Sequence, residues 1–133
     1  MLLLKNYFLM NPNNLKYTQD HEWIKIKANQ AIIGITHFAQ KELGDIVYVE
    51  IETLDNDLDS GEVFGTVEAV KTVSDLFMPM SGKIIEINEE IIDNPELVNS
   101  DPYGKGWMIK IEISNVDETK NLLDSKSYEK ITG

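Results

Sequence analysis

The chain is 133 residues long, with 12 lysines, no arginine and 23 acidic residues, so its formal charge is −11. One domain of globular composition is expected from this length and from a hydrophobic share of 42% with 26% charged residues. The acidic, arginine-free composition argues against nucleic-acid and membrane-surface binding, and the absence of cysteine excludes disulfides, thiolate metal sites and cysteine nucleophiles.

The N-terminal segment, residues 1–10, is apolar but too short to span a membrane. It lacks the small-residue cleavage site of a signal peptide and the arginines and serines of a mitochondrial presequence. We therefore treat residues 1–14 as an N-terminal extension that could be flexible and residues 15–133 as the domain, with Met10 as an alternative initiator. The expected location is the cytoplasm, and the mitochondrial matrix is the alternative.

The first half of the chain reads as three strands and one helix. Apolar patterning predicts the strands at residues 22–27, 31–35 and 45–51. Thr36 is suited to cap a short helix over residues 37–43, and Gly44 is suited to end it. The side chains of this helix that are expected to face the core are Phe38, Ala39 and Leu43.

The second half continues in the same manner, with strands predicted at residues 63–70, 83–88 and 106–113. Pro79 and Gly82 bracket a corner at which a strand must bend or stop. Residues 90–99 read as helical or irregular, and residues 116–131 favour one or two amphipathic helical turns. Many short strands separated by turns indicate a small sandwich or barrel.

The sequence lacks the usual catalytic and metal-binding motifs. His21 and His37 stand sixteen positions apart, without the close spacing typical of zinc ligands, so no metal site is expected. No nucleophile elbow, phosphate-binding loop or dinucleotide-binding fingerprint is present. In a chain of this charge, most carboxylates are solvated surface groups. These features argue against an enzyme.

One lysine, Lys71, stands between two β-prone runs, with Glu68 three residues before it and Asp75 four residues after it. If the chain turns at Val70 and Lys71, this lysine projects from the tip of a hairpin. A lysine at a turn is usually a solvated surface charge, so the segment alone does not establish a modified residue.

Several longer stretches carry a resemblance to a known family. They are Tyr17-x-x-x-His21-Glu22-Trp23, residues 34–50 (GITHFAQKELGDIVYVE), residues 61–88 (GEVFGTVEAVKTVSDLFMPMSGKIIEIN), residues 94–111 (NPELVNSDPYGKGWMIKI), and Leu122-Leu123-Asp124 with Tyr128. In order and spacing, residues 15–131 resemble the H-protein family of the glycine cleavage system, within the biotinyl/lipoyl-domain class. The sequence departs from the family pattern in residues 51–59, where Glu52 and Asp55 stand at positions usually held by Pro and Gly.

The resemblance implies a mainly β fold, a barrel-sandwich hybrid of the lipoyl-domain type with short peripheral helices. The apolar residues that we expect in its core are Trp23, Ile33, Ile35, Val47, Val49, Phe64, Val67, Ile85, Ile87, Met108, Ile109 and Ile111.

The resemblance also implies the roles of particular residues. Lys71 matches the lysine that receives lipoic acid through an amide. Glu68 and Gly82 match positions that help the lipoylating enzyme recognise this lysine, and we expect a positive φ angle at Gly82. Glu22 and Asp75 match acidic positions in a cleft that holds the loaded arm, and Asp20 matches a cleft position where a hydroxyl residue is common.

The implied function is that of a lipoyl carrier in glycine catabolism and one-carbon metabolism, not of an enzyme. Its implied partners are the PLP-dependent glycine decarboxylase (P protein), the tetrahydrofolate-dependent aminomethyltransferase (T protein), the dihydrolipoyl dehydrogenase (L protein) and a lipoylating enzyme. The carrier would take an aminomethyl group from the first enzyme to the second, and we expect it to be a monomer.

Three alternatives remain open at this point. An H-like protein could use the same lysine as a relay that hands lipoyl groups to other complexes. A biotin carrier is permitted by the fold, but that family's Met-Lys-Met triplet is replaced here by Val70-Lys71-Thr72. An unmodified interaction module is the third alternative, and an unchanged intact mass would favour it.

Overall fold

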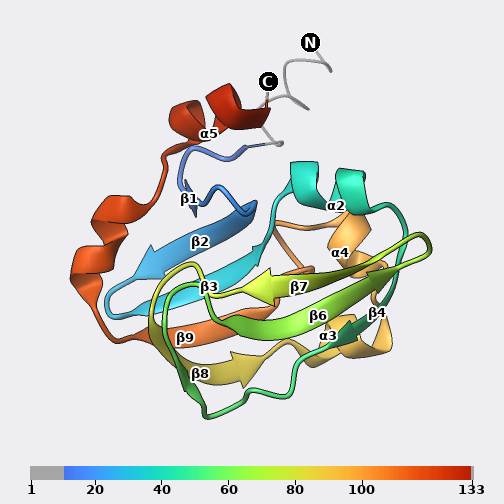
Figure 1. Cartoon of the computed structure of the whole chain (residues 1–133), viewed down its shortest axis with the longest axis horizontal. Coiled ribbons are helices and arrows are strands. Elements are labelled where there is room, and N and C mark those ends of the chain that lie inside the picture. Colours follow the sequence, from blue (N-terminus) through green and yellow to red (C-terminus); the bar gives the residue numbers. More distant parts are fainter. Residues whose placement is uncertain (1–10, 133) are drawn as a thin grey trace.

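The computed structural model describes residues 11–132, which form two antiparallel β-sheets with short helices around them (Figure 1). In spatial order, the six-stranded sheet contains β1 (Lys16–Tyr17), β2 (Glu22–Lys27), β3 (Gln30–Ile35), β9 (Ile109–Ile113), β8 (Gly82–Ile87) and β5 (Asp57–Leu58). The three-stranded sheet contains β4 (Ile46–Glu50), β6 (Val63–Ala69) and β7 (Val73–Phe77). This architecture confirms the mainly β, barrel-sandwich-like prediction.

The helices are short and lie at the edges of the sheets. They are α2 (His37–Leu43), α3 (Glu89–Asp93), α4 (Leu97–Ser100), the 3₁₀ helix η1 (Val116–Asn121) and α5 (Ser125–Thr132). The predicted ends of α2 are confirmed: the Thr36 hydroxyl accepts a hydrogen bond from the Ala39 amide, and Gly44 follows the helix with φ 83°. Among residues 11–132, no helix is long and apolar enough to cross a membrane.

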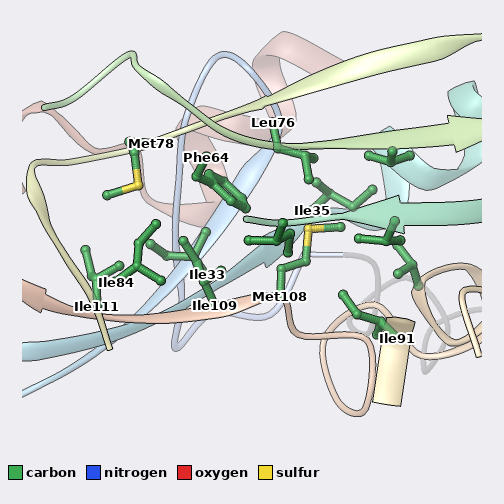
Figure 2. Packing of buried hydrophobic residues seen from close by; sticks show 14 of the residues in the cluster. Ile33, Ile35, Phe64, Leu76, Met78, Ile84, Ile91, Met108, Ile109 and Ile111 are labelled. Atoms are coloured by element: carbon green, nitrogen blue, oxygen red, sulfur yellow. The ribbon is translucent and has the colours of Figure 1, made fainter. Parts of the chain in front are cut away.

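The main hydrophobic core lies between the two sheets (Figure 2). Phe64 and Leu76 extend from the three-stranded sheet toward Ile33 and Ile109 of the six-stranded sheet. The core candidates that the structure confirms as buried in this core are Ile33, Ile35, Val49, Phe64, Val67, Met108, Ile109 and Ile111. Trp23 is also buried, in a smaller cluster with Leu15, Tyr17 and Tyr128. Burial of this apolar surface is the main force that holds the two sheets together.

Val47 is not a core residue, which corrects the prediction, because its side chain is 53% exposed. The pairing of β4 with β6 shifts register between Ile46 and Tyr48. Such a bulge adds a residue to one strand and interrupts the alternation of inward and outward side chains. Ile46 and Val49 are therefore buried, and the two residues between them face solvent.

A second register shift explains a second correction. Ile85 was expected in the core but is only partly buried, and Ile84 is fully buried instead. The pairing of β8 with β9 shifts between Ile84 and Glu86, which moves the inward position by one residue. Ile87 is also only partly buried, although it packs against the core.

The segment that departs from the family pattern forms an ordered turn followed by β5. Asp55 has φ 70°, a left-handed conformation that glycine adopts more easily than any other residue. Its amide donates a hydrogen bond to the Ile84 carbonyl at 2.8 Å, and Ile84 in turn donates to the Asn56 carbonyl. Asp55 therefore adopts the backbone conformation that a glycine at this position would adopt more easily, and this lowers the free energy of unfolding somewhat.

The C-terminal helix α5 closes a smaller aromatic cluster beside β1. Tyr128 stacks on Tyr17 with ring centroids 4.7 Å apart, and both rings are fully buried. Nearby, the Tyr17 hydroxyl donates to the Pro12 carbonyl, and the Ser125 hydroxyl donates to the Asn13 side chain. The hydrogen bonds of Tyr17 and Ser125 therefore tie residues 12 and 13 of the predicted extension to the domain. Residues 1–10 of that extension lie outside the described residues.

Candidate functional site

The hairpin that joins β6 to β7 ends at the right-hand edge of the molecule in Figure 1. Lys71 lies in the turn of this hairpin and is exposed. The Ala69 amide donates to the Thr72 carbonyl at 2.7 Å and closes the turn. The Val70 amide donates to the Asp45 carbonyl at 3.0 Å, which fastens the turn to the start of β4. The backbone around the lysine is thus held in place while its side chain is free to carry an attached group.

Glu68 lies on β6, three residues before the lysine, and is exposed. In the sheet register it pairs with Tyr48 of β4 and Val73 of β7. Directly paired residues of antiparallel strands present their side chains on the same face. Glu68 is therefore accessible to any protein that approaches the lysine from this face.

Gly82 is buried at the start of β8, and its φ is not positive, which corrects our expectation. The structure gives a different reason for glycine at this position. A Cβ atom at residue 82 would lie only 2.7 Å from the Glu112 carbonyl oxygen on β9. A side chain would therefore push the two paired strands apart, so the close approach of β9 requires glycine here.

A hollow of about 380 Å³ brings together the acidic residues that the sequence placed far apart. Glu22 reaches it from β2, Asp75 from β7, and Asp20 from the turn before β2. Glu42 of α2 adds a fourth carboxylate, and none of the residues that line the hollow is a lysine. The apolar residues of its lining are Ile35, Phe38, Ala39, Leu43 and Leu76. The hollow therefore combines an apolar lining with a strong preference for positive charge.

Glu22 is the buried member of this group, with only 3% of its surface exposed. The Thr18 hydroxyl donates to its Oε1 at 2.5 Å, and the Glu22 amide donates to the Thr18 hydroxyl oxygen. Burial, partly opposed by the Thr18 bond, raises the pKa of the Glu22 carboxyl to about 7. Near neutral pH this carboxyl is therefore only partly ionised, and a cation in the hollow would favour its charged form.

His21 forms part of the wall of the hollow. Its Nδ1 lies 2.8 Å from the Tyr128 hydroxyl, which lies 2.7 Å from the Thr36 hydroxyl. The imidazole also contacts the Phe38 ring, with centroids 4.7 Å apart, and burial lowers its pKa. These contacts fix the wall of the hollow through helix α5.

Sequence reasoning missed three polar residues of the hollow, His21, Glu42 and Ser74. A signal for Glu42 was available, because it follows Phe38 by four residues and so lies on the same face of α2. His21 gave no such signal. Its φ of 68° turns it into position, and no local pattern in the sequence predicts that backbone conformation. The described residues contain no group of three or more His, Asp and Glu side chains able to hold a metal ion.

The sequence model of the glycine cleavage H-protein family matches residues 15–133. The chain belongs to this family. A glycine cleavage system H protein of Carboxydothermus hydrogenoformans is 57% identical over 120 residues, which cover 90% of this chain and 92% of that protein. The crystal structure of a glycine cleavage system H protein from Mycobacterium marinum matches with a TM-score of 0.82 and 39% identity, covering 90% of this chain and 96% of that one.

Family membership confirms the resemblance found in the sequence. It makes the chain a lipoyl carrier of glycine cleavage, a carrier protein rather than a catalyst. The described site agrees with that role in two respects: a rigid turn presents one exposed lysine, and an acidic hollow lies beside the strand that follows it.

Proposed function

We propose that Lys71 carries lipoic acid as an amide on its Nζ atom. The observation that supports this most strongly is the exposed position of Lys71 at the tip of a fastened hairpin, in a chain of the H-protein family. When attached, the lipoyl group supplies the disulfide and thiol chemistry that a chain without cysteine lacks. The hairpin tip gives this group a fixed anchor from which it can visit several enzymes in turn.

We further propose that the arm takes the aminomethyl group of glycine from the PLP-dependent glycine decarboxylase to the tetrahydrofolate-dependent aminomethyltransferase. The dihydrolipoyl dehydrogenase then reoxidises the arm, and the carrier acts as a monomer. Glu68 and Gly82 support attachment by the lipoylating enzyme. Glu68 does so on the exposed face, and Gly82 does so by allowing β8 to lie close to β9.

The acidic hollow is suited to hold the cationic cargo between visits. Asp75 lies on β7, four residues after Lys71 in the turn, so their Cα atoms are separated by at most about 14 Å. An extended lysine side chain with an acyl group attached can turn back over this distance. Glu22 and Asp75 then lie where an ammonium group needs carboxylates, with Asp20 and Glu42 beside them.

These carboxylates protect the cargo by keeping its amine protonated. Breakdown of an aminomethyl sulfide by water to thiol, formaldehyde and ammonia requires the nitrogen lone pair to assist cleavage of the carbon–sulfur bond, and a protonated amine has no lone pair available. Glu22 favours the protonated amine most strongly when it is itself ionised, because opposite charges attract more in a partly buried site than in water.

The experiment is to lipoylate the protein, incubate it with glycine and glycine decarboxylase, and measure its intact mass. A gain of one aminomethyl group is expected for the wild type and for Lys126→Arg, but not for Lys71→Arg. After the enzyme is removed, Glu22→Gln and Asp75→Asn should release ammonia about ten-fold faster than the wild type, since one charge-assisted hydrogen bond is worth roughly 1.5–3 kcal/mol. A lipoylated wild type that gains no aminomethyl group would support the lipoyl relay instead.

A further inference from the structure

We propose that an apolar surface beside Lys71 is the docking surface for the lipoylating enzyme. This surface consists of Val47, Tyr48, Val70 and Val73, and we call it the tip surface. The inference rests on the proposed lipoylation of Lys71 and adds to it a surface and a kind of partner: an enzyme face with an apolar recess and a cationic group beside it.

The residues of the tip surface are exposed to an unusual degree for apolar side chains. The exposed fractions are 53% for Val47, 48% for Tyr48, 71% for Val70 and 62% for Val73. Single exposed apolar residues are ordinary, but a group of them on one face indicates a contact with a partner.

The strand register places these residues around the lysine. Tyr48, Glu68 and Val73 form one row across the three-stranded sheet, and Val70 stands next to Lys71 in the turn. Val47 joins them because the bulge between Ile46 and Tyr48 leaves two successive residues, Val47 and Tyr48, facing outward. Regular alternation would place only one of these two neighbours on the outer face, so the bulge enlarges the apolar surface next to the turn.

An enzyme that acylates Lys71 must contact this part of the molecule. The reacting nitrogen is at the end of one lysine side chain, so an active site that encloses it must also cover the neighbouring residues of the turn and the row below it. The valine and tyrosine side chains supply apolar area for that contact, and its burial favours association. Glu68 stands between Tyr48 and Val73 in the row, so a cation on the enzyme beside the apolar recess would complement it.

The test uses isosteric Val→Thr changes, which keep the β-branched shape and make the surface polar. The double variant Val47→Thr/Val73→Thr is compared with Val116→Thr, a change at another exposed valine (66%) in η1. Unmodified protein, lipoate, ATP and a lipoate ligase are the reagents, and the measurements are KM, kcat and the Kd of the ligase complex. Circular dichroism and thermal unfolding verify that each variant is folded.

The double variant is expected to raise both KM and Kd by about five-fold or more with kcat unchanged, whereas Val116→Thr should match the wild type. A wild-type KM in the folded double variant would overturn the docking surface while leaving lipoylation of Lys71 intact. A dimer that the double variant abolishes, together with unchanged KM, would also overturn it and assign the surface to contacts between copies. Failure of the wild type to accept lipoate at Lys71 would overturn both this inference and the proposed function.

Discussion

Glu22 is a buried carboxyl whose pKa is raised by burial from 4.5 to about 7, and this makes stability depend on pH. Between these two values the folded protein keeps a proton that the unfolded chain releases. The free energy of unfolding therefore falls as the pH rises through this interval, by up to about 3 kcal/mol from this residue. Glu22→Gln lacks the titrating proton but can still accept the Thr18 hydrogen bond, so its stability should lose this pH dependence.

Urea unfolding of wild type and Glu22→Gln at several pH values between 5 and 8 measures the difference. We expect the variant to become progressively more stable than the wild type as the pH rises. Glu112→Gln, a change at an exposed carboxylate of β9, serves as the control and should follow the wild type. Parallel pH profiles for wild type and Glu22→Gln would show that the Glu22 carboxyl is not perturbed in the folded protein.

The backbone of Asp55 is left-handed, with φ 70°, and this conformation costs free energy in a residue other than glycine. Asp55→Gly should raise the free energy of unfolding by about 0.5 kcal/mol, since glycine adopts this conformation without strain and the gain exceeds its larger chain entropy when unfolded. Asp57→Gly, two residues later in strand β5, should instead destabilise the protein. Thermal unfolding distinguishes the two changes, and a lower midpoint for Asp55→Gly would contradict the prediction.

At the scale of elements, the position of α5 depends on the Tyr128 side chain. The Tyr128 hydroxyl lies within hydrogen-bond distance of His21 and Thr36, and the Tyr128 ring stacks on Tyr17. Tyr128→Phe keeps the stacking and removes the hydroxyl, which should lower the free energy of unfolding by about 1–2 kcal/mol. Urea unfolding measures the loss. The exposed Tyr48→Phe is the control, and an equal effect of both changes would mean that the Tyr128 hydroxyl does not fasten the helix.

The elements that sequence reasoning predicted well are those fixed by local chemistry. Strand β2 alternates apolar and polar residues from Ile24 to Lys27, and helix α2 has a capping hydroxyl at one end and a glycine at the other. The errors at Val47 and Ile85 fall next to bulges, where pairing between distant strands overrides the local pattern. The two-residue strands β1 and β5 were missed for a related reason, since only their pairing with a neighbouring strand defines them.

At the scale of the whole molecule, the lysine and the acidic hollow differ in how far the sequence predicts them. A turn between two β-prone runs indicated the hairpin tip at Lys71 from local pattern alone. The meeting of Glu22, Glu42 and Asp75 depends on how β2, α2 and β7 come together, which no local spacing encodes. Glu22 and Asp75 were predicted only through the family resemblance, and the resemblance did not point to Glu42.

The most direct test of the proposed role is to locate the lipoyl group. Intact-mass measurement followed by peptide mapping should be carried out on protein incubated with lipoate and a competent ligase. We predict the mass of one lipoyl group, located on the peptide that contains Lys71 and absent from a folded Lys71→Arg variant. A lipoyl group on any other of the twelve lysines, or none on the wild type, would contradict the assignment of Lys71 as the carrier residue.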